Sequence, residues 1–388
     1  MTKRVFGITL TALFIAVPLS AQSLFNAAGL GIPLEALEGR ARAMGSMGIG
    51  LPGGGFAPTD PAALARLSVS TGIMAAQPSW VDYAAESGVS GSFNGQRFPL
   101  LGIAYPLLGG MASVQVGSFM DQRYQATTTG SVDVSGLTVP FTDTFVQDGS
   151  VSTLNLGYAR TIGRNWSVGL SVGRYAGGVD RTLTRTYGDE ETTDVDEYVE
   201  VGSWTYRGFS LTVGGAWQVG SSVRIAASAE IPTELDAEAS DDTRGADRTY
   251  ALPLQLRAGA SATVGPGIVV SASGLLSDWS DTQEDLVGGG RSDRADGFGV
   301  GVELSRARLL GFDAPLRFGF RQSTLPFWLQ NDDVTERIYS GGLGFQLNST
   351  DAVVLAGVDL AVERGSRFGG GLTEDFWRLT ISLLASGF

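Results

Sequence analysis

Apolar and polar residues alternate along much of this chain. In the stretch ALPLQLRAGASATVGPGIVVSASGLL (251–276), the even positions from Leu252 to Val264 are apolar, and the odd positions are mostly polar or small. A second alternating run follows the short break at residues 265–267. Strict alternation predicts β-strands with one apolar face and one polar face.

The same pattern predicts fourteen strands and no comparably strong helix after residue 68. We expect strands at residues 68–80, 98–106, 111–119, 151–161, 165–175, 206–218, 222–231, 249–264, 268–278, 295–305, 314–322, 336–347, 352–362 and 374–386. Short connections alternate with long ones that carry most of the acidic residues, such as YGDEETTDVDEYVE (187–200). An even strand number with tight turns at one end and long loops at the other is typical of a bacterial outer-membrane barrel.

The apolar faces could be covered in two ways. In a soluble β-sandwich they would pack on each other, and in a membrane barrel they would contact lipid. The polar faces are rich in Gly, Ser, Thr and Gln, whereas a soluble sheet normally carries more charge. The tryptophans also favour lipid, because they fall near strand ends and could form two interfacial girdles. They are Trp166 and Trp217 beside short turns, and Trp80, Trp204, Trp279 and Trp377 at the opposite ends. The predicted fold class is therefore all-β, a transmembrane antiparallel β-barrel of about 14 strands.

The first 23 residues predict export. Lys3 and Arg4 precede an apolar run from Val5 to Leu19, and small residues follow, which is the layout of a secretory signal peptide. A cut after Ala21 is also compatible with the sequence. The alternative is a membrane anchor, but the run is short for a span of about 20 residues. We therefore expect residues 1–23 to be removed and the mature protein to reside in the bacterial outer membrane.

Composition excludes several classes of function. The chain has no cysteine and no histidine, so it has no thiolate metal site and no Ser–His or Cys–His nucleophile. A formal net charge of −13 argues against nucleic acid as a partner. The acidic loops could bind Ca²⁺, but their spacing matches no calcium loop and solvated loops are the simpler interpretation. We expect no enzyme activity, no cofactor and no metal site.

Residues 24–67 do not alternate, so they belong to neither the wall nor a simple linker. Residues 34–44 could form a short helix, and so could residues 61–67, with Asp60 as N-cap and Pro61 at the first helical position. We expect this segment to lie inside the barrel, ahead of the barrel domain at residues 68–388.

The same segment resembles the FadL-type family of outer-membrane transporters for long-chain fatty acids and other hydrophobic compounds. The resemblance rests on GRARAMGSMGIGL (39–51) and APTDPAALARL (57–67), directly before the predicted barrel. It implies fourteen strands and an N-terminal hatch that plugs the lumen, often ending in Asn-Pro-Ala. Here the motif is Asp60-Pro61-Ala62, a partial match. Shuttle barrels of the type IX secretion system share this fold and remain an alternative.

The resemblance implies passive uptake of a hydrophobic ligand, for which the chain offers two candidate sites. Phe327, Trp328 and Leu329 could form an outer hydrophobic patch, or they could belong to the interfacial girdle. Arg257, Arg317 and Arg321 occupy polar positions of the alternating pattern, so their side chains should face the lumen. A guanidinium there could hold a ligand carboxylate. The alternative for these arginines is an ion-pair network with Glu303 or with acids of the hatch.

The favoured function is an outer-membrane channel for hydrophobic molecules such as long-chain fatty acids. Its expected partners are outer-membrane lipid and a hydrophobic small molecule. A structural or secretion barrel that docks another protein at its loops or periplasmic turns is the alternative. A general porin is disfavoured by the extra N-terminal segment, and a lipase by the missing histidine.

Overall fold

The computed structural model describes residues 23–134, 137–188, 196–286, 290–309, 312–349 and 354–387. The predicted signal peptide lies outside the described residues, apart from Ser23. No helix within these ranges is long and apolar enough to cross a membrane.

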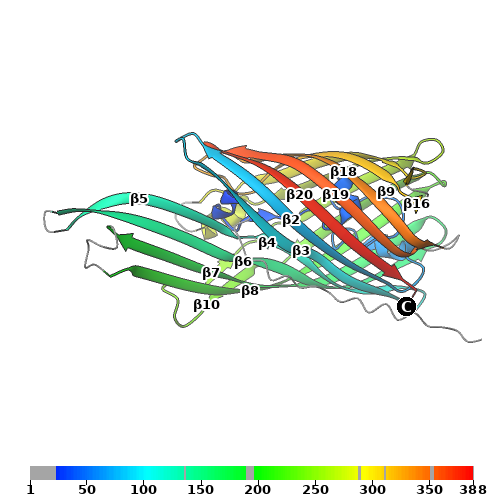
Figure 1. Cartoon of the computed structure of the whole chain (residues 1–388). Helices are drawn as coiled ribbons and strands as arrows, with labels where there is room; N and C mark the ends of the chain where they lie inside the picture. Colours follow the sequence, from blue (N-terminus) through cyan, green and yellow to red (C-terminus); the bar gives the residue numbers. More distant parts are fainter. Residues whose placement is uncertain are drawn as a thin grey trace, which may run out of the picture.

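Fourteen antiparallel strands form a closed wall (Figure 1). Each wall strand pairs with the next one along the chain, and β2 closes the wall by pairing with β20. The wall strands are β2 (Thr71–Ala85), β3 (Ser90–Leu107), β4 (Gly110–Asp121), β6 (Leu137–Ile162), β7 (Trp166–Tyr187), β8 (Tyr198–Val219), β9 (Val223–Pro232), β12 (Gln255–Thr263), β13 (Ile268–Asp278), β14 (Arg294–Leu304), β17 (Leu316–Thr324), β18 (Thr335–Ser349), β19 (Val354–Gly369) and β20 (Leu372–Ser386). Each of the fourteen predicted strands overlaps one of them, so the predicted barrel is confirmed.

Several strands continue far beyond the barrel at the end with the long connections. Figure 1 shows β5 to β8 projecting past the other strands, away from the C-terminus. The region 120–150, expected as a loop, contains β5 (Tyr124–Val134), which pairs with the outer half of β6. Outside the membrane neither face of a strand contacts lipid, so the alternation that reveals wall strands fades there.

The remaining elements are short. The strands are β1 (Ile32–Pro33), β10 (Leu235–Ala239), β11 (Arg248–Tyr250), β15 (Arg308–Leu309) and β16 (Phe312–Asp313). The helices are η1 (Leu24–Ala27), α1 (Gly39–Ala43), η2 (Pro61–Arg66) and η3 (Ser280–Asp285), of which only α1 is an α-helix.

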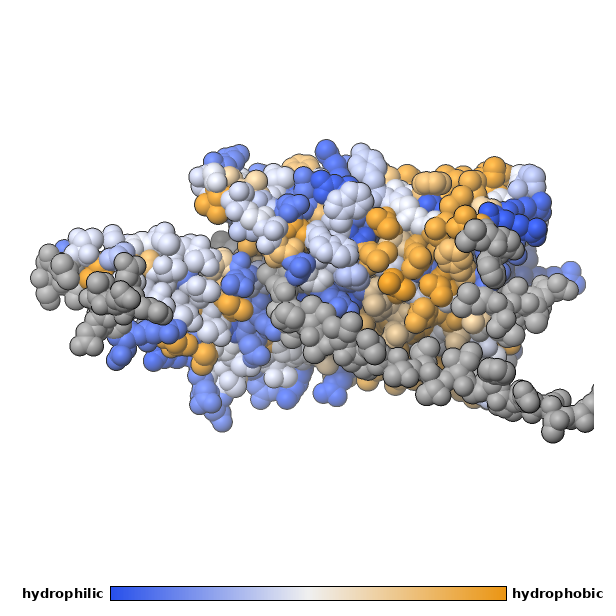
Figure 2. All heavy atoms as spheres, viewed as in Figure 1, coloured by the Kyte–Doolittle hydropathy of each residue, from blue (hydrophilic) through white to orange (hydrophobic). Residues whose placement is uncertain are grey.

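Apolar side chains cover the outside of the wall. Leu254, just before β12, and Leu256 on β12 face outward and are 49% and 45% exposed. Arg257, the next residue, faces the lumen and is only 5% exposed. Figure 2 shows the apolar side chains gathered in a band over the part of the barrel nearer the C-terminus. A closed wall with its large apolar side chains outward and its polar ones inward is a membrane barrel, so the soluble sandwich is excluded.

Two tryptophan pairs mark the edges of this apolar belt. Trp166 and Trp217 stack beside the short turns, with ring centroids 5.6 Å apart, and Trp80 and Trp377 are direct cross-strand partners near the long loops. The prediction of girdle positions was wrong for the other two tryptophans. Trp204 and Trp279 are 8% and 2% exposed, because both share the inward parity of their strands. Their indole N–H groups donate inside the protein, to Ala246 O and Ser277 Oγ.

The amino-terminal segment, residues 23–67, lies against the inward-facing side of the wall. Its first residues pack near the long-loop end, where Ile32 pairs with Asp121 of β4. Its α-helix is limited to α1, shorter than the predicted 34–44. The second predicted helix is the 3-10 helix η2, and Asp60 does not cap it. The side chain of Asp60 instead accepts hydrogen bonds from Arg224 of β9 and from Gly50 N, because the strand guanidinium competes for it.

Glycines on the inner face of the wall allow this segment to make backbone contacts. An added Cβ at Gly299 of β14 would lie 1.7 Å from Gly45 O, and one at Gly319 of β17 would lie 2.3 Å from Gly45 N. The same holds on the other side of the barrel, where a Cβ at Gly169 of β7 would lie 2.4 Å from the carbonyl carbon of Pro61. The high glycine content therefore has a specific use, which is to bring a second layer of backbone against the wall.

We predict that Gly299→Ala displaces the segment from the wall. Overpacking a fitted contact costs about 1–3 kcal/mol, and here the opposing atom is backbone that cannot change rotamer. We expect trypsin to cut after Arg40 or Arg42 in the folded variant but not in the parent protein. Gly215→Ala on β8 is the matched control, since its Cβ would meet nothing within 4 Å. Equal cleavage of both variants would contradict the assignment.

Candidate functional site

A small cavity lies between the amino-terminal segment and the wall, in the half of the barrel nearer the long loops. One part of its lining is apolar. These residues include Ile32, Leu34, Leu275, Trp279 and Leu325. The other part is cationic. The arginines are Arg42, Arg97, Arg321, Arg367 and Arg378. We call this space the outer cavity.

The arginines of the outer cavity are tied together by shared carboxylates. Glu363 lies 2.8 Å from both Arg42 Nη1 and Arg321 Nη2. Glu336 lies 2.7 Å from Arg367 Nε and 3.4 Å from Arg378 Nη2. The first group joins α1 to β19 and β17, and the second joins β18 to β19 and β20.

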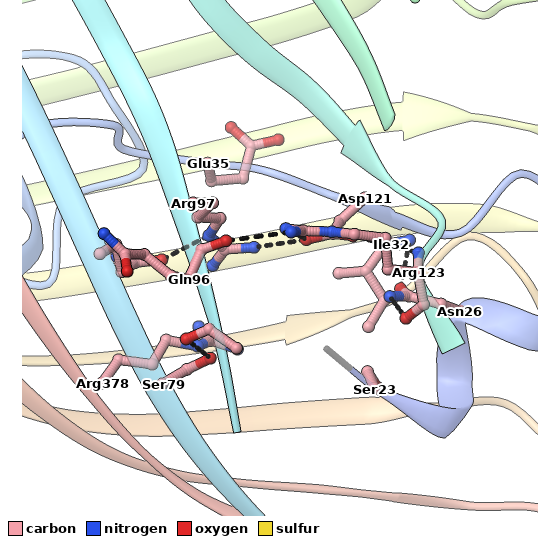
Figure 3. Close-up of polar contacts among 12 residues, drawn as sticks. Ser23, Asn26, Ile32, Glu35, Ser79, Gln96, Arg97, Asp121, Arg123 and Arg378 are labelled. Atoms are coloured by element: carbon pink, nitrogen blue, oxygen red, sulfur yellow. Dashed lines mark hydrogen bonds and ion pairs between the residues drawn. The ribbon is translucent and has the colours of Figure 1, made fainter. Parts of the chain in front are cut away.

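A third group of ion pairs lies on β3 and at the end of β4. Figure 3 shows Asp121 at the end of β4 between Arg97 and Arg123. Arg123 binds it closely, at 2.8 Å, whereas Arg97 donates to it from 3.4 Å and also donates to Gln77 Oε1. Arg367 also pairs with Glu374, 3.0 Å away.

Positive charge is in excess around the outer cavity. The arginines are Arg42, Arg97, Arg123, Arg321, Arg367 and Arg378, and the carboxylates paired with them are Asp121, Glu336, Glu363 and Glu374. Glu35 also lines the cavity, so six arginines face five carboxylates and one guanidinium charge is in excess. Buried charge without a counter-charge is costly, so the cavity favours an anion.

Arg321 is the arginine best placed to bind such an anion. Its Nη1 is buried and has no hydrogen-bond partner among the described residues; the same holds for Nε of Arg42, but Nη1 and Nη2 of Arg42 are bound to Glu363 and to Glu35 O. The carboxylate neighbour of Arg321, Glu363, is already bound by Arg42. An arginine fork with a free donor can hold a carboxylate through charge-assisted hydrogen bonds.

A second small cavity has the opposite charge balance. We call it the inner cavity; residues 33–35 line both cavities and separate them. Its charged lining residues are Glu35, Glu38, Glu230 and Arg257. Arg257 lies 3.1 Å from Glu35 and 3.5 Å from Glu230, so its single charge is shared between two carboxylates.

The three predicted lumen arginines are all buried and inward-facing, but the structure does not bring them together. Arg321 lines the outer cavity and Arg257 the inner one. Arg317 pairs with Glu303 and Asp359 and lines neither cavity. The network with Glu303 considered from the sequence is therefore present for Arg317.

The predicted hatch motif Asp60-Pro61-Ala62 lies at the short-turn end of the lumen. Asp60 pairs with Arg224 at 3.0 Å, and Pro61 and Ala62 touch the wall glycines Gly169 and Gly214. The motif thus anchors the segment to β7, β8 and β9.

The predicted outer patch is only partly exposed. Phe327 is 3% exposed and packs edge-on against Trp279, with centroids 5.4 Å apart, so it is part of a buried cluster rather than an open surface. Trp328 and Leu329 are partly exposed. Phe327 turns inward because Gly29 leaves room for its ring.

The fold resembles solved structures of transport proteins. The toluene transporter TbuX of Ralstonia pickettii gives a TM-score of 0.60 at 14% sequence identity, over 92% of this chain and 99% of that one. A FadL homologue of Pseudomonas aeruginosa gives 0.61 at 11% identity, over 92% and 99%. The toluene transporter TodX of P. putida gives 0.59 at 11% identity, over 91% and 99%. No protein-family model and no curated protein sequence matches the chain.

The chain has the FadL-type fold. The fourteen-strand antiparallel barrel implied by the sequence resemblance is thereby confirmed. The outer-membrane location predicted from the signal and the strands is the location of barrels with this fold.

Glu38, which borders the inner cavity, makes the stability of the protein depend on pH. Burial and the nearby Asp359 raise the pKa of Glu38 to about 7, although Arg40 and Arg317 act against the shift. The unfolded chain loses this proton at lower pH than the folded protein does. Stability therefore falls as pH rises from the ordinary glutamate range to about 7.

We predict that Glu38→Gln removes this loss. The variant and the parent should unfold at similar temperatures near about pH 5, and the variant should be the more stable near about pH 8. Thermal unfolding in detergent measures both. Glu86→Gln, in the exposed turn after β2, is the control and should leave the pH dependence unchanged. A parallel pH profile for Glu38→Gln and the parent would contradict the assignment.

Proposed function

We propose that this protein is an outer-membrane channel for hydrophobic molecules that carry one acidic head group. The outer cavity provides the chemistry for such a ligand. Its guanidinium excess suits a single carboxylate, and its apolar side suits a hydrocarbon tail. Long-chain fatty acids belong to this class.

We further propose that residues 24–67 act as a hatch. Three polar anchors support this role, namely Arg42–Glu363, Asp60–Arg224 and Arg40–Glu303. They join the segment to β19, β9 and β14, on different sides of the barrel. A ligand in the outer cavity must pass residues 33–35 to reach the inner cavity, so movement of this stretch would control passage.

The arginine excess is what separates this proposal from transport of a neutral hydrocarbon. The neighbouring structures are named as toluene transporters and a monoaromatic hydrocarbon channel, whose ligands carry no charge. A neutral ligand here would leave the surplus guanidinium charge without a counter-ion. We therefore assign the acidic group to the ligand of this chain.

The projecting sheet offers an entry surface. In the wall, the odd-numbered residues of β6 face the lumen, and the same parity continues outward to Phe145 and Phe141. Tyr124 stacks on Phe145 at 5.2 Å, and Arg185 lies 4.1 Å above the ring of Phe141. This aromatic surface replaces Phe327 as our candidate for first contact with a hydrophobic ligand.

We predict that Arg321→Gln abolishes the preference for an acid over its ester. Hexadecanoic acid should bind the parent protein about tenfold more tightly than its methyl ester, because a charge-assisted hydrogen bond is lost in the ester. The variant should bind both equally. Calorimetry in a detergent without acidic groups measures these affinities.

Arg317→Gln is the matched control, since it also removes a buried arginine of β17 but one that lines neither cavity. It should keep the preference. Equal affinity of the parent for acid and ester would contradict the head-group assignment. Loss of the preference in both variants would show a general effect of removing buried charge.

A further inference from the structure

The outside of the wall carries a group of charged residues at the long-loop edge of the apolar belt. Trp80 and Trp377, each 49% exposed, form the last apolar cross-strand pair of β2 and β20 at this edge. Two residues further along the same faces, Asp82 and Asp375 are direct partners. The outer surface therefore changes from apolar to charged within two residues along each strand.

Two arginines on the neighbouring strands complete the group. Arg364 of β19 is the direct partner of Trp377, and its guanidinium lies 5.5 Å from the indole centroid and 3.3 Å from Asp375. Arg337 of β18 lies closer to the long loops than Arg364 does, because it pairs with Ser366, two residues further along β19. Its guanidinium lies 5.1 Å from the ring centroid of Phe368. Both side chains are exposed. Arg337 Nε donates to Gln322 Oε1, 3.1 Å away, and Arg364 Nη2 pairs with Asp375, so the remaining N–H groups of each guanidinium are the ones that could donate to another molecule.

The two aspartates are not neutralised by the protein alone. Like charges directly opposite each other in a sheet are unfavourable. Asp375 has Arg364, but Asp82 makes no ion pair with any residue that the structure describes. Within those same ranges no three acidic side chains are arranged to hold a metal ion. A divalent cation between Asp82 and Asp375 would need further oxygen ligands from another molecule.

We propose that Asp82, Arg337, Arg364 and Asp375 bind the phosphorylated head group of lipopolysaccharide. The arginines would donate to its phosphates, and a divalent cation would join the phosphates to the two aspartates. The tryptophans and Val362, 46% exposed, would contact its acyl chains. This inference rests on the membrane orientation of the proposed function, with short turns in the periplasm, and is independent of the ligand in the lumen.

Position and charge both select this lipid. The site lies at the edge opposite the short turns, so only the outer leaflet reaches it; inner-leaflet phospholipid meets the Trp166–Trp217 edge. The chain as a whole is acidic, with a net charge of −13, and would repel an anionic lipid. A local arrangement of guanidinium groups and cation-binding carboxylates overcomes that repulsion at one place on the wall.

The test compares the full-length mature protein with two double variants, Arg337→Gln/Arg364→Gln and Asp82→Asn/Asp375→Asn. Arg174→Gln is the control, because Arg174 is another exposed, outward-facing arginine, on β7, away from this group. Each protein is freed of lipid in detergent and titrated with purified lipopolysaccharide, with Mg²⁺ or with EDTA. The rise in unfolding temperature reports binding. Parallel titrations use phosphatidylglycerol, and the heat-dependent gel shift of folded barrels confirms folding.

We expect the arginine double variant to bind lipopolysaccharide about tenfold more weakly than the parent. The aspartate double variant should lose the response to Mg²⁺, and Arg174→Gln should match the parent. Unchanged affinity of the folded arginine variant would overturn the inference, and so would equal binding of phosphatidylglycerol by the parent. Neither result bears on the channel proposal, which is judged by the acid and ester affinities of Arg321→Gln.

Discussion

Backbone contact between the amino-terminal segment and the barrel wall is the constraint on which the rest of the structure depends. Gly45 fits against Gly299 and Gly319 only because none of the three has a side chain. Strand interiors pay an entropic cost for glycine, and the wall accepts it at the inward positions that the segment touches. Gly45 lies against the neighbouring strands β14 and β17, and Pro61 lies against β7 on the other side of the barrel, so wall and segment fix each other's position.

This contact determines which charged side chains meet in the lumen. A segment held against the wall brings its own ionisable groups into a low-dielectric interior, where each requires a partner. Arg42 and Asp60 find theirs in Glu363 and Arg224. The balance of charge differs between the two ends of the lumen. Arginines exceed acidic residues around the outer cavity, and acidic residues exceed arginines around the inner one. A ligand with an acidic head group would therefore be held in the outer cavity and opposed at the inner one.

The wall could be predicted from the sequence because lipid on one side and polar lumen on the other enforce alternation. The site could be predicted only in part. Arg321 lies within an alternating strand, so its inward direction followed from parity. Arg97 and Arg367 lie in strand portions beyond the predicted limits, where alternation weakens outside the belt. The pairing of Arg42 with Glu363, 321 residues apart, depends on how the segment is seated, which no local pattern encodes.

Hydrogen exchange of the segment in the detergent-solubilised protein tests the central claim most directly. Peptides covering residues 39–64 should exchange as slowly as those of β20, because their backbone is packed against the wall and bonded to it, as Gly39 N is to Ser382 and Met47 N to Ser273. Exchange of these peptides within seconds, while β20 stays protected, would show that the segment is not seated. The glycine contacts and the arginine cavity built on them would then not describe the protein.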